Sequence, residues 1–287
     1  MNAELQIEKA KRFHDLHYAG KMLILPNIWD TLGALLLESL KYPAIATASA
    51  AIAYTNGKND GEQMLFSDVL SVLKKIATSV DIPLTADIES GYAENDTQLQ
   101  QNIKLIIETG IVGINIEDTN KRTKEFFTIE AQCHRIRLIK KAAGEMGIPI
   151  FINARTDIFF RHDVFSTPEL KIDEAIKRGT AYKDAGADCF FPITLIREED
   201  IQQLVNTLNM PINVLLIPGI PDLNTLCKMG VARASLGPSF LKIAIKSMRD
   251  LALQLKEYKG LPAITGNDIT TDYLKNLVNK NYLFDIN

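Results

Sequence analysis

The sequence of 287 residues has only three cysteines and no long apolar run, and each shortage excludes a class of protein. Cys133, Cys189 and Cys227 are odd in number and far apart, unlike the cysteines of a disulfide framework or a zinc site. No apolar run approaches the ~18 residues of a membrane-spanning helix. The polar, acidic start of the chain is unlike a signal peptide. We therefore expect a cytoplasmic protein that does not associate with membranes.

An excess of positive charge is also missing. The chain has 32 Lys and Arg residues against 35 Asp and Glu residues, which gives a net charge of −3. Nucleic acids and anionic membranes attract basic surfaces, so the sequence predicts neither as a partner. With 46% hydrophobic residues, the chain is long enough for one large core or two smaller ones.

The sequence does contain short apolar runs that alternate with longer segments of helical periodicity. Most runs are too short for buried helices and are bounded by Pro, Gly or Asp, which indicates strands. The expected strands are residues 23–25, 44–47, 84–88, 113–116, 150–152, 189–191, 212–217 and 234–236. The expected helices are residues 31–40, 66–79, 98–109, 129–146, 171–185, 198–208, 222–229 and 238–258.

This alternation predicts an α/β fold, a (β/α)8 TIM-type barrel. The alternative is an open doubly wound sheet, but no Gly-x-Gly-x-x-Gly follows the first strand. Residues 3–18 predict an N-terminal helix whose Phe13 and Leu16 could cap the barrel floor. Residues 260–287 predict a C-terminal helical arm or cap, which could make oligomer contacts. No repeat or second domain is visible, so residues 1–287 are expected to form a single barrel domain.

Carboxylates follow two of the predicted strands. Asp87 and Glu89 end one strand, and Glu117 and Asp118 end the next. The carboxyl ends of parallel strands meet at one face of a barrel, so these side chains should lie around one point. A lone Asp could instead cap a helix or close a turn. Together the carboxylates predict a site for a hard cation, most simply Mg2+, with Asp118 as a neighbour rather than a ligand.

Seven short motifs resemble, in order, those of the isocitrate lyase/phosphoenolpyruvate mutase superfamily. They are Pro26–Asp30, Ala46–Ala50, Asn59–Glu62, Asp87–Tyr92, Ile116–Asp118, Asn153–Asp157 and Leu236–Pro238. The similarity runs from about residue 20 to residue 258. One Asp-x-Glu motif alone would be a weak signal, but the ordered set is specific for the family. It is not specific for one reaction.

The resemblance implies a Mg2+-dependent lyase, with Mn2+ as a possible replacement ion. Its substrate would be a small α-oxo or α-hydroxy carboxylate, whose carbon–carbon or carbon–phosphorus bond breaks through an enolate. The family's direct metal ligand falls on Asp87. Its water-mediated partners fall on Glu89, Glu117 and Asp60.

The resemblance also implies residues that hold the substrate. Arg155 would grip a carboxylate with two hydrogen bonds. The hydroxyl of Ser49 and the backbone amides of Ser49 and Ala50 would hold other oxygens, and Asn213 would add a polar contact. Arg155 could instead be a buried partner of a barrel carboxylate, and Ser49 a packing residue in a strand of small residues. Asp60, Arg155 and Glu117 are the expected catalytic residues.

The loop after Glu117 departs from the best-known relatives. Isocitrate and methylisocitrate lyases carry Lys-Lys/Arg-Cys-Gly-His there, whereas residues 119–127 contain no cysteine. Cys133 comes later, at helical spacing, and is expected to be inert. Lys121 and Lys124 could serve in the loop, although loop lysines are usually solvated. His162 could also approach the barrel mouth.

Three kinds of function remain open on the sequence. The favoured one is a Mg2+-dependent lyase or hydrolase acting on an oxo-acid. The second is a phosphonomutase or phosphonopyruvate hydrolase, and the third is an inactive barrel that binds an oxo-acid. In each case the expected partner is a small oxo-acid, and the expected assembly is a homodimer or homotetramer.

Overall fold

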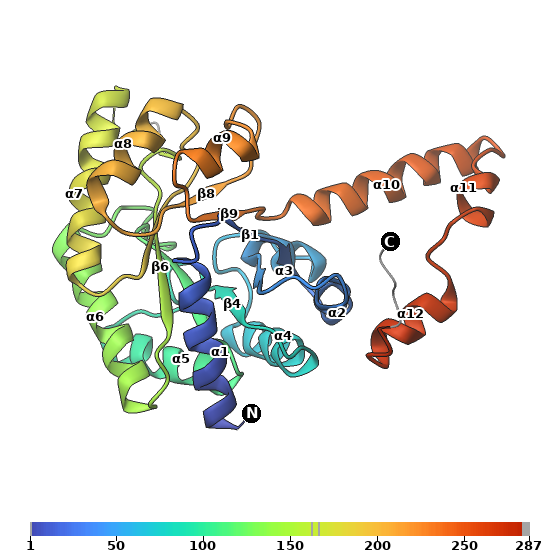
Figure 1. The fold of residues 1–287 in the computed structure, drawn as a ribbon, viewed down its shortest axis with the longest axis horizontal. Coiled ribbons are helices and arrows are strands. Elements are labelled where there is room, and N and C mark those ends of the chain that lie inside the picture. Colours follow the sequence, from blue (N-terminus) through green and yellow to red (C-terminus); the bar gives the residue numbers. More distant parts are fainter. Residues whose placement is uncertain (1, 162, 166, 283–287) are drawn as a thin grey trace.

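The computed structural model describes residues 2–161, 163–165 and 167–282, and its parallel strands form a ring (Figure 1). One run of strands has the order β2-β3-β4-β5-β6-β7 and the other has the order β1-β9-β8. Pro26 separates β1 from β2, and a parallel bridge between Phe190 and Ile212 joins β7 to β8. The strands are β1 Leu23–Leu25, β2 Asn27–Ile28, β3 Ile45–Thr47, β4 Leu84–Asp87, β5 Gly113–Glu117, β6 Phe151–Thr156, β7 Cys189–Pro192, β8 Asn213–Leu215 and β9 Arg233–Ser235. The predicted (β/α)8 TIM-type barrel is confirmed.

Helices surround the ring, and polar N-cap residues set where many of them begin. Side-chain oxygens of the N-caps accept hydrogen bonds from backbone N–H groups of the first turn, which have no acceptor within the helix. Such caps are Asp30, Asn95, Thr128, Thr167 and Asp222. The surrounding helices are α2 Thr31–Ser39, α4 Phe66–Ser79, α5 Asp96–Glu108, α6 Ile129–Glu145, α7 Pro168–Asp184, α8 Glu198–Leu208 and α9 Leu223–Lys228. A further helix, α3 Ser49–Thr55, was not predicted.

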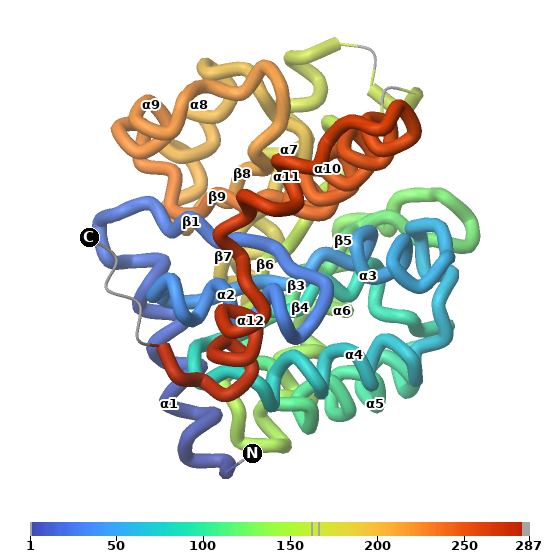
Figure 2. The backbone as a smooth tube through the Cα atoms, turned by 90° about the vertical axis from the view of Figure 1, so that its right-hand side faces the viewer, coloured from blue at the N-terminus to red at the C-terminus, as the bar shows by residue number. Residues whose placement is uncertain are grey.

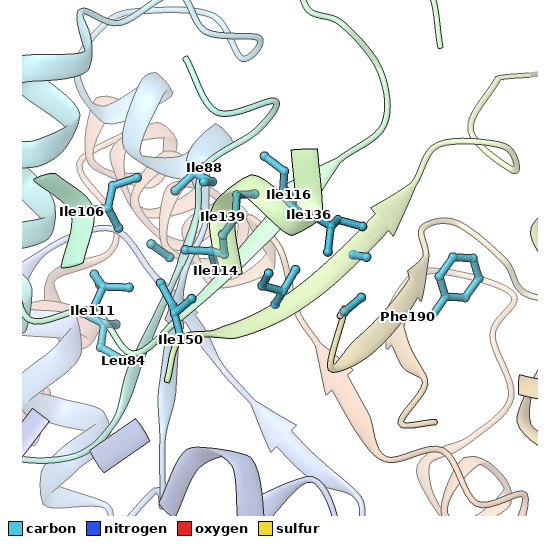
Figure 3. Packing of buried hydrophobic residues seen from close by; sticks show 14 of the residues in the cluster. Leu84, Ile88, Ile106, Ile111, Ile114, Ile116, Ile136, Ile139, Ile150 and Phe190 are labelled. Atoms are coloured by element: carbon cyan, nitrogen blue, oxygen red, sulfur yellow. The ribbon is translucent and has the colours of Figure 1, made fainter. Parts of the chain in front are cut away.

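Isoleucine dominates the layer between the strands and the helices. Successive side chains of a strand point to opposite faces. In β5, Ile114 and Ile116 are fully buried against Ile136 and Ile139 of α6 (Figure 3). The residues between them belong to the inner face of the ring. One strand therefore builds the hydrophobic core with one face and supplies polar side chains to the barrel interior with the other.

Helix α1 (Ala3–Leu16) closes the amino-terminal end of the ring, as the sequence predicted. Phe13 is fully buried, and its ring lies 5.2 Å from that of Phe151 at the start of β6. The side chain of Leu16 packs at the edge of the same cluster.

The C-terminal helices leave the barrel and then return to it. Residues 238–258 were expected as the last barrel helix, but α10 (Ser239–Lys256) projects away from the ring (Figure 1), and Leu241 is its buried residue. Helical periodicity predicts an apolar face, but it does not say which surface covers that face. After α11 (Leu261–Thr265), α12 (Thr271–Val278) packs beside α2 (Figure 2), with Leu277 buried. None of the described helices is long and apolar enough to cross a bilayer.

Candidate active site

A cavity of about 310 Å3 lies at the carboxyl ends of the strands. Its wall includes Asp87 from β4 and Arg155 from β6, together with Ser49, Ala50 and Asp60 from the region after β3. In parallel barrels this face carries substrate binding and catalysis, because each strand delivers its last side chains and its following loop there. The structure therefore brings these five predicted residues to one cavity.

Asp87 is the last residue of β4, and two partners fix its position. Its Oδ2 accepts a hydrogen bond from the hydroxyl of Ser49 at 2.6 Å. Its backbone amide donates to Oγ1 of Thr47 at 3.1 Å. Thr47 of β3 thus holds the backbone of Asp87, and Ser49 of α3 orients the carboxylate, which lines the cavity.

Ser49 and Ala50 begin α3 and do not continue a strand. Backbone N–H groups in the first turn of a helix have no acceptor within that helix, so they favour an anionic neighbour. The amide of Ser49 lies 3.4 Å from Oδ2 of Asp87. Both the amide and the hydroxyl of Ser49 therefore donate to Asp87, and Ser49 and Ala50 line the cavity.

Glu89 is buried next to this cavity, with 3% of its surface exposed. Its Oε1 accepts a hydrogen bond from the hydroxyl of Tyr92, and its Oε2 accepts one from the amide of Glu62, both at 2.7 Å. Burial raises the pKa of Glu89 to about 7, and the nearby charges of Asp60 and Asp87 act in the same direction. The hydroxyl of Tyr92 opposes this shift.

Glu62 organises the turn after β4, a role that the sequence did not reveal. Its Oε1 accepts hydrogen bonds from the amide and hydroxyl of Ser90, at 3.0 and 2.7 Å, and from the amide of Tyr92 at 3.0 Å. The only signal in the sequence was that the Asn59–Glu62 motif ends in an acidic residue. The groups that donate to Glu62 depend on how its loop folds beside the turn after β4.

Glu117, at the end of β5, lies between two cations. Its Oε2 pairs with Nη1 of Arg155 at 2.9 Å, and its Oε1 pairs with Nζ of Lys121. Nε of Arg155 donates to Oδ1 of Asp157 at 2.7 Å. Arg155 therefore has the carboxylate partners that the sequence allowed as an alternative to substrate binding. Within the described residues, Nη2 of Arg155 donates to no protein acceptor.

Lys121 is not the solvated loop lysine that its charged surroundings suggested. Only 14% of its side chain is exposed, and it lines the cavity. Burial raises the pKa of Glu117 to about 8, although the charges of Arg155 and Lys121 act in the opposite direction. Lys121, in the loop after β5, thus places its ammonium group beside the carboxylate of Glu117 at the end of the same strand.

Asp118 points away from the cavity. Its Oδ2 accepts hydrogen bonds from Nη1 of Arg178 at 3.1 Å and from the hydroxyl of Tyr182 at 2.9 Å. Its Oδ1 accepts the amide of Asp157 at 3.0 Å. Adjacent residues of a strand face opposite sides, so Glu117 and Asp118 could not both point inward. Asp118 instead attaches the end of β5 to α7.

Three other candidates do not reach the cavity wall or cannot be placed. Asn213 is fully buried, and its Oδ1 accepts the hydroxyl of Ser235 at 3.1 Å; Ser235 lines the cavity in its stead. The thiol of Cys133 lies on α6, 3.3 Å from the carbonyl oxygen of Ala181, and burial raises its pKa, as expected for an inert cysteine. His162 lies outside the described residues.

The donor set fits a hydrated divalent cation. Desolvation and the charge of Asp87 raise the pKa of Asp60, so negative charge is crowded at the cavity mouth. Among the described residues, no three His, Cys, Asp or Glu side chains converge as direct ligands. An ion that keeps several waters needs few direct protein ligands, and Mg2+ is of this kind. A metal ion that Asp87 alone binds directly, while other carboxylates bind its waters, would fit both the crowded negative charge and the lack of three converging ligands among the described residues.

Known proteins are similar to this chain in sequence and in fold. The phosphoenolpyruvate phosphomutase family model matches residues 13–256. An uncharacterised protein of Mycobacterium tuberculosis is 28% identical over 225 residues, which cover 78% of this chain and 81% of the relative. The 2-methylisocitrate lyase of Bacillus subtilis is 27% identical over 214 residues, which cover 72% and 67%. The crystal structure of a candidate phosphonomutase from Burkholderia cenocepacia J2315 is 35% identical with a TM-score of 0.83, and the match covers 87% of this chain and 99% of that one.

The family match spans most of the chain, and the solved relative has the same fold over nearly its whole length. The chain therefore belongs to the phosphoenolpyruvate mutase/isocitrate lyase superfamily.

Proposed function

We propose that this protein is a Mg2+-dependent lyase that breaks a carbon–carbon or carbon–phosphorus bond of a small α-oxo or α-hydroxy carboxylate through an enolate. The observation that carries the proposal is the charge arrangement of one cavity. Carboxylates of Asp60 and Asp87 lie in the same cavity as the cations Lys121 and Arg155. Such a cavity offers negative groups to a divalent ion and positive groups to an acidic substrate.

In this proposal Asp87 holds Mg2+ directly, and Asp60, Glu89 and Glu117 bind its waters. The bound ion would supply Lewis-acid stabilisation to the negative charge that develops on the substrate. Mn2+ accepts the same oxygen ligands and could replace it. Ser49 supports the arrangement because its hydroxyl already orients the Asp87 carboxylate.

The substrate carboxylate would be held by Arg155 and by the first turn of α3. Nη2 of Arg155 has no acceptor among the described residues, while Glu117 and Asp157 fix the plane of the guanidinium. The amides of Ser49 and Ala50 would donate to other substrate oxygens. The cavity of about 310 Å3 is at the small end of ligand sites, which suits an acid of a few carbons.

A phosphonomutase or phosphonopyruvate hydrolase is the second candidate. It is favoured by the 35% identity to a candidate phosphonomutase over nearly all of that chain. A third possibility, an oxo-acid-binding barrel without turnover, would keep the cavity but catalyse nothing.

One assay separates these functions. The protein would be incubated with Mg2+ and oxaloacetate, 2-methylisocitrate, alkylmalates or phosphonopyruvate, and pyruvate release would be followed. We expect Mg2+-dependent pyruvate release that oxalate, a mimic of the planar enolate, inhibits. Phosphorus NMR of the phosphonopyruvate reaction distinguishes hydrolysis from rearrangement. Oxalate binding without turnover would identify the inactive barrel, and neither binding nor turnover would contradict the proposal.

The assembly is proposed to be a homodimer or homotetramer. Along α10, Ile245, Met248 and Leu255 are 53%, 66% and 44% exposed. Their spacing of three and seven residues places them on one helix face, the arrangement of helices that pair. We assign this face, rather than residues 260–287 alone, to contact with a second copy of the chain.

A further inference from the structure

A buried arginine without a carboxylate partner lies in the interior of the barrel. Arg233 begins β9 and is fully buried. Within the described part of the chain it forms no ion pair, and its Nη1 has no hydrogen-bond partner. A buried charge is costly unless it is paired, so an unpaired guanidinium requires an explanation.

The neighbours of Arg233 do not neutralise it. Burial raises the pKa of the Cys189 thiol to about 12, so the thiol is uncharged at neutral pH. Burial and the charge of Arg233 lower the pKa of His17 to about 3, so the imidazole is also neutral. The carboxylate that attracts Arg233 is that of Asp87, in the cavity wall. The positive charge is therefore felt by the candidate active site.

Two hydrogen bonds connect Arg233 to the cavity. Its Nη2 donates to Oδ1 of Asn115 at 3.3 Å, and its Nε donates to the hydroxyl oxygen of Ser235 at 3.1 Å. Asn115 and Ser235 both line the cavity. Arg233 thus lies beneath the cavity in the barrel interior and donates to two residues that line the cavity.

Arginine can only donate, and this fixes the orientation of the amide above it. The atom of Asn115 that faces Arg233 must be the oxygen, because the amide nitrogen could not accept. Nδ2 of Asn153 also donates to this oxygen, at 2.6 Å. Oδ1 of Asn115 is then occupied from below by two donors. No described residue accepts from its Nδ2, so that amide group remains as a donor for a ligand.

We propose that Asn115 is a substrate-binding residue and that Arg233 is the positioning residue that aims its Nδ2 at a negatively charged oxygen of the oxo-acid. The unpaired charge of Arg233 adds a favourable potential beneath that oxygen. The inference rests on the proposed function, since it names a further residue of the same site. Neither residue was singled out by the sequence.

Oxalate affinity in saturating Mg2+, measured by calorimetry, tests the inference together with thermal unfolding. Arg233→Met removes the charge and both donors but keeps an unbranched buried side chain. We expect oxalate to bind about tenfold to a hundredfold more weakly, the range for a lost hydrogen bond to a charged group. The melting temperature should stay equal or rise, because an unpaired buried charge is removed. A residue that only supported the fold would show the opposite pattern.

Asn115→Asp is an isosteric second variant. The carboxylate can still accept from Arg233 and Asn153, so the fold is retained, but an anionic oxygen replaces the donor. Oxalate affinity should again fall at least about tenfold, the scale of one charge-assisted bond. Cys189→Ala is the matched control: it removes a fully buried side chain of the same barrel interior and contacts neither Asn115 nor Ser235 through a hydrogen bond. It should lower the melting temperature and leave oxalate affinity unchanged.

The outcomes are distinguishable. If the unchanged protein binds no oxalate in Mg2+, the proposed function and this inference both fail. If it binds oxalate and both variants bind it equally well, the proposed function stands and the roles of Asn115 and Arg233 are wrong. If Arg233→Met does not fold, the oxalate affinity of Asn115→Asp alone tests the inference.

Discussion

At the scale of single residues, the ends of β4 and β5 carry carboxylates in different surroundings. Asp87 lines the cavity and its carboxylate is oriented by the hydroxyl of Ser49, whereas each oxygen of Glu117 pairs with a cation. A carboxylate that neutral donors orient keeps its charge available to a metal ion. One that two cations already neutralise is better suited to act through water.

Asp87→Asn tests this difference. The amide can keep the contact with Ser49, so the fold should be retained while the charge is lost. We expect the Mg2+ affinity measured by calorimetry to fall more than about tenfold, and Glu117→Gln to reduce it less, because outer partners contribute less than direct ligands. Equal Mg2+ affinity in Asp87→Asn and the unchanged protein would remove Asp87 from the metal site.

Arg155→Lys tests whether Arg155 binds the carboxylate of the substrate. Lysine keeps the positive charge but cannot contact Glu117, Asp157 and a substrate at once. Oxalate binding should weaken by about 2 kcal/mol, within the range for a charge-assisted bond. The melting temperature should also fall, because Glu117 or Asp157 loses a partner in a buried network. Unchanged oxalate affinity with a lower melting temperature would make Arg155 purely structural.

The sequence predicted the carboxylates of the site better than the residues that hold them in place. Asp87 was recognisable because a charged residue at a strand end requires a partner, whereas Asp60 and Arg155 were indicated by the resemblance to the superfamily. Glu62 and Lys121 were not, because their contacts depend on how two loops fold back on the cavity. Arg233 gave no signal, since its environment follows from the closure of β9 against β8 and β1.

At the scale of elements, the loop after β5 is held between its two neighbouring loops. A bridge between Thr119 and Phe126 shapes it, and Arg122 pairs with Glu94 of the preceding loop at 2.5 Å. The guanidinium of Arg161, from the following loop, lies 5.4 Å from the centre of the Phe126 ring. Lys121 reaches from this loop into the cavity. Because Lys121 reaches the cavity from this loop, we expect the loop to close over a bound ligand.

Limited trypsin digestion tests the loop as a lid. Arg122 is 61% exposed, so cleavage should occur near it in the free protein. Mg2+ and oxalate together should slow this cleavage, because a lid that closes over the ligand is less often in an extended, cleavable form. Cleavage at Lys259, whose side chain is 71% exposed beyond α10, is the internal control and should not change. Equal protection at both sites, or at neither, would contradict a lid.

His17, the C-cap residue of α1, is expected to make the stability of the barrel depend on pH. His17 stacks on Phe151 with ring centroids 4.1 Å apart, and its pKa is lowered from 6.5 to about 3 by burial and by Arg233. The unfolded chain therefore binds a proton that the folded protein excludes between these values. The free energy of unfolding should fall as the pH decreases through this window, by up to about 1.4 kcal/mol per pH unit from this group.

His17→Phe should reduce that pH dependence. The ring still packs between Phe13 and Phe151, but it no longer titrates. Denaturant unfolding between pH 7 and pH 4 should show a shallower loss of stability than in the unchanged protein. His14→Phe, an exposed change in the same helix, serves as control. The same pH dependence in all three proteins would show that His17 is not the source.

The elements themselves were largely predictable, because strand and helix periodicities are local. Residues 66–79 and 198–208 were expected as helices with the bounds that α4 and α8 have. Helix α3 was missed because a run of small residues after a strand has no amphipathic face. The direction of α10 was missed because its partner surface is not encoded in its own periodicity.

At the scale of the whole molecule, α10 is the element that the isolated chain leaves incomplete. It is a helix of 18 residues with Leu241 as its buried residue, whereas α12 returns to α2 with Leu277 buried and Tyr282 donating to Glu38. The chain therefore contacts the barrel at the start of α10 and again through α12, while the apolar face of α10 between these points stays exposed. Large exposed apolar surfaces on an otherwise compact protein mark contact with a partner.

Light scattering can decide whether that partner is a second copy. We expect a mass of two or four times 32.0 kDa for the unchanged protein. The double change Ile245→Glu and Met248→Glu places charges on the exposed face of α10, so it should shift the mass to that of one chain without unfolding the barrel. Leu105→Glu charges an apolar side chain on α5 that is 42% exposed, and it should leave the assembly intact. A single-chain mass for the unchanged protein would falsify the assignment of α10, and loss of assembly in both variants would show that any added surface charge has this effect.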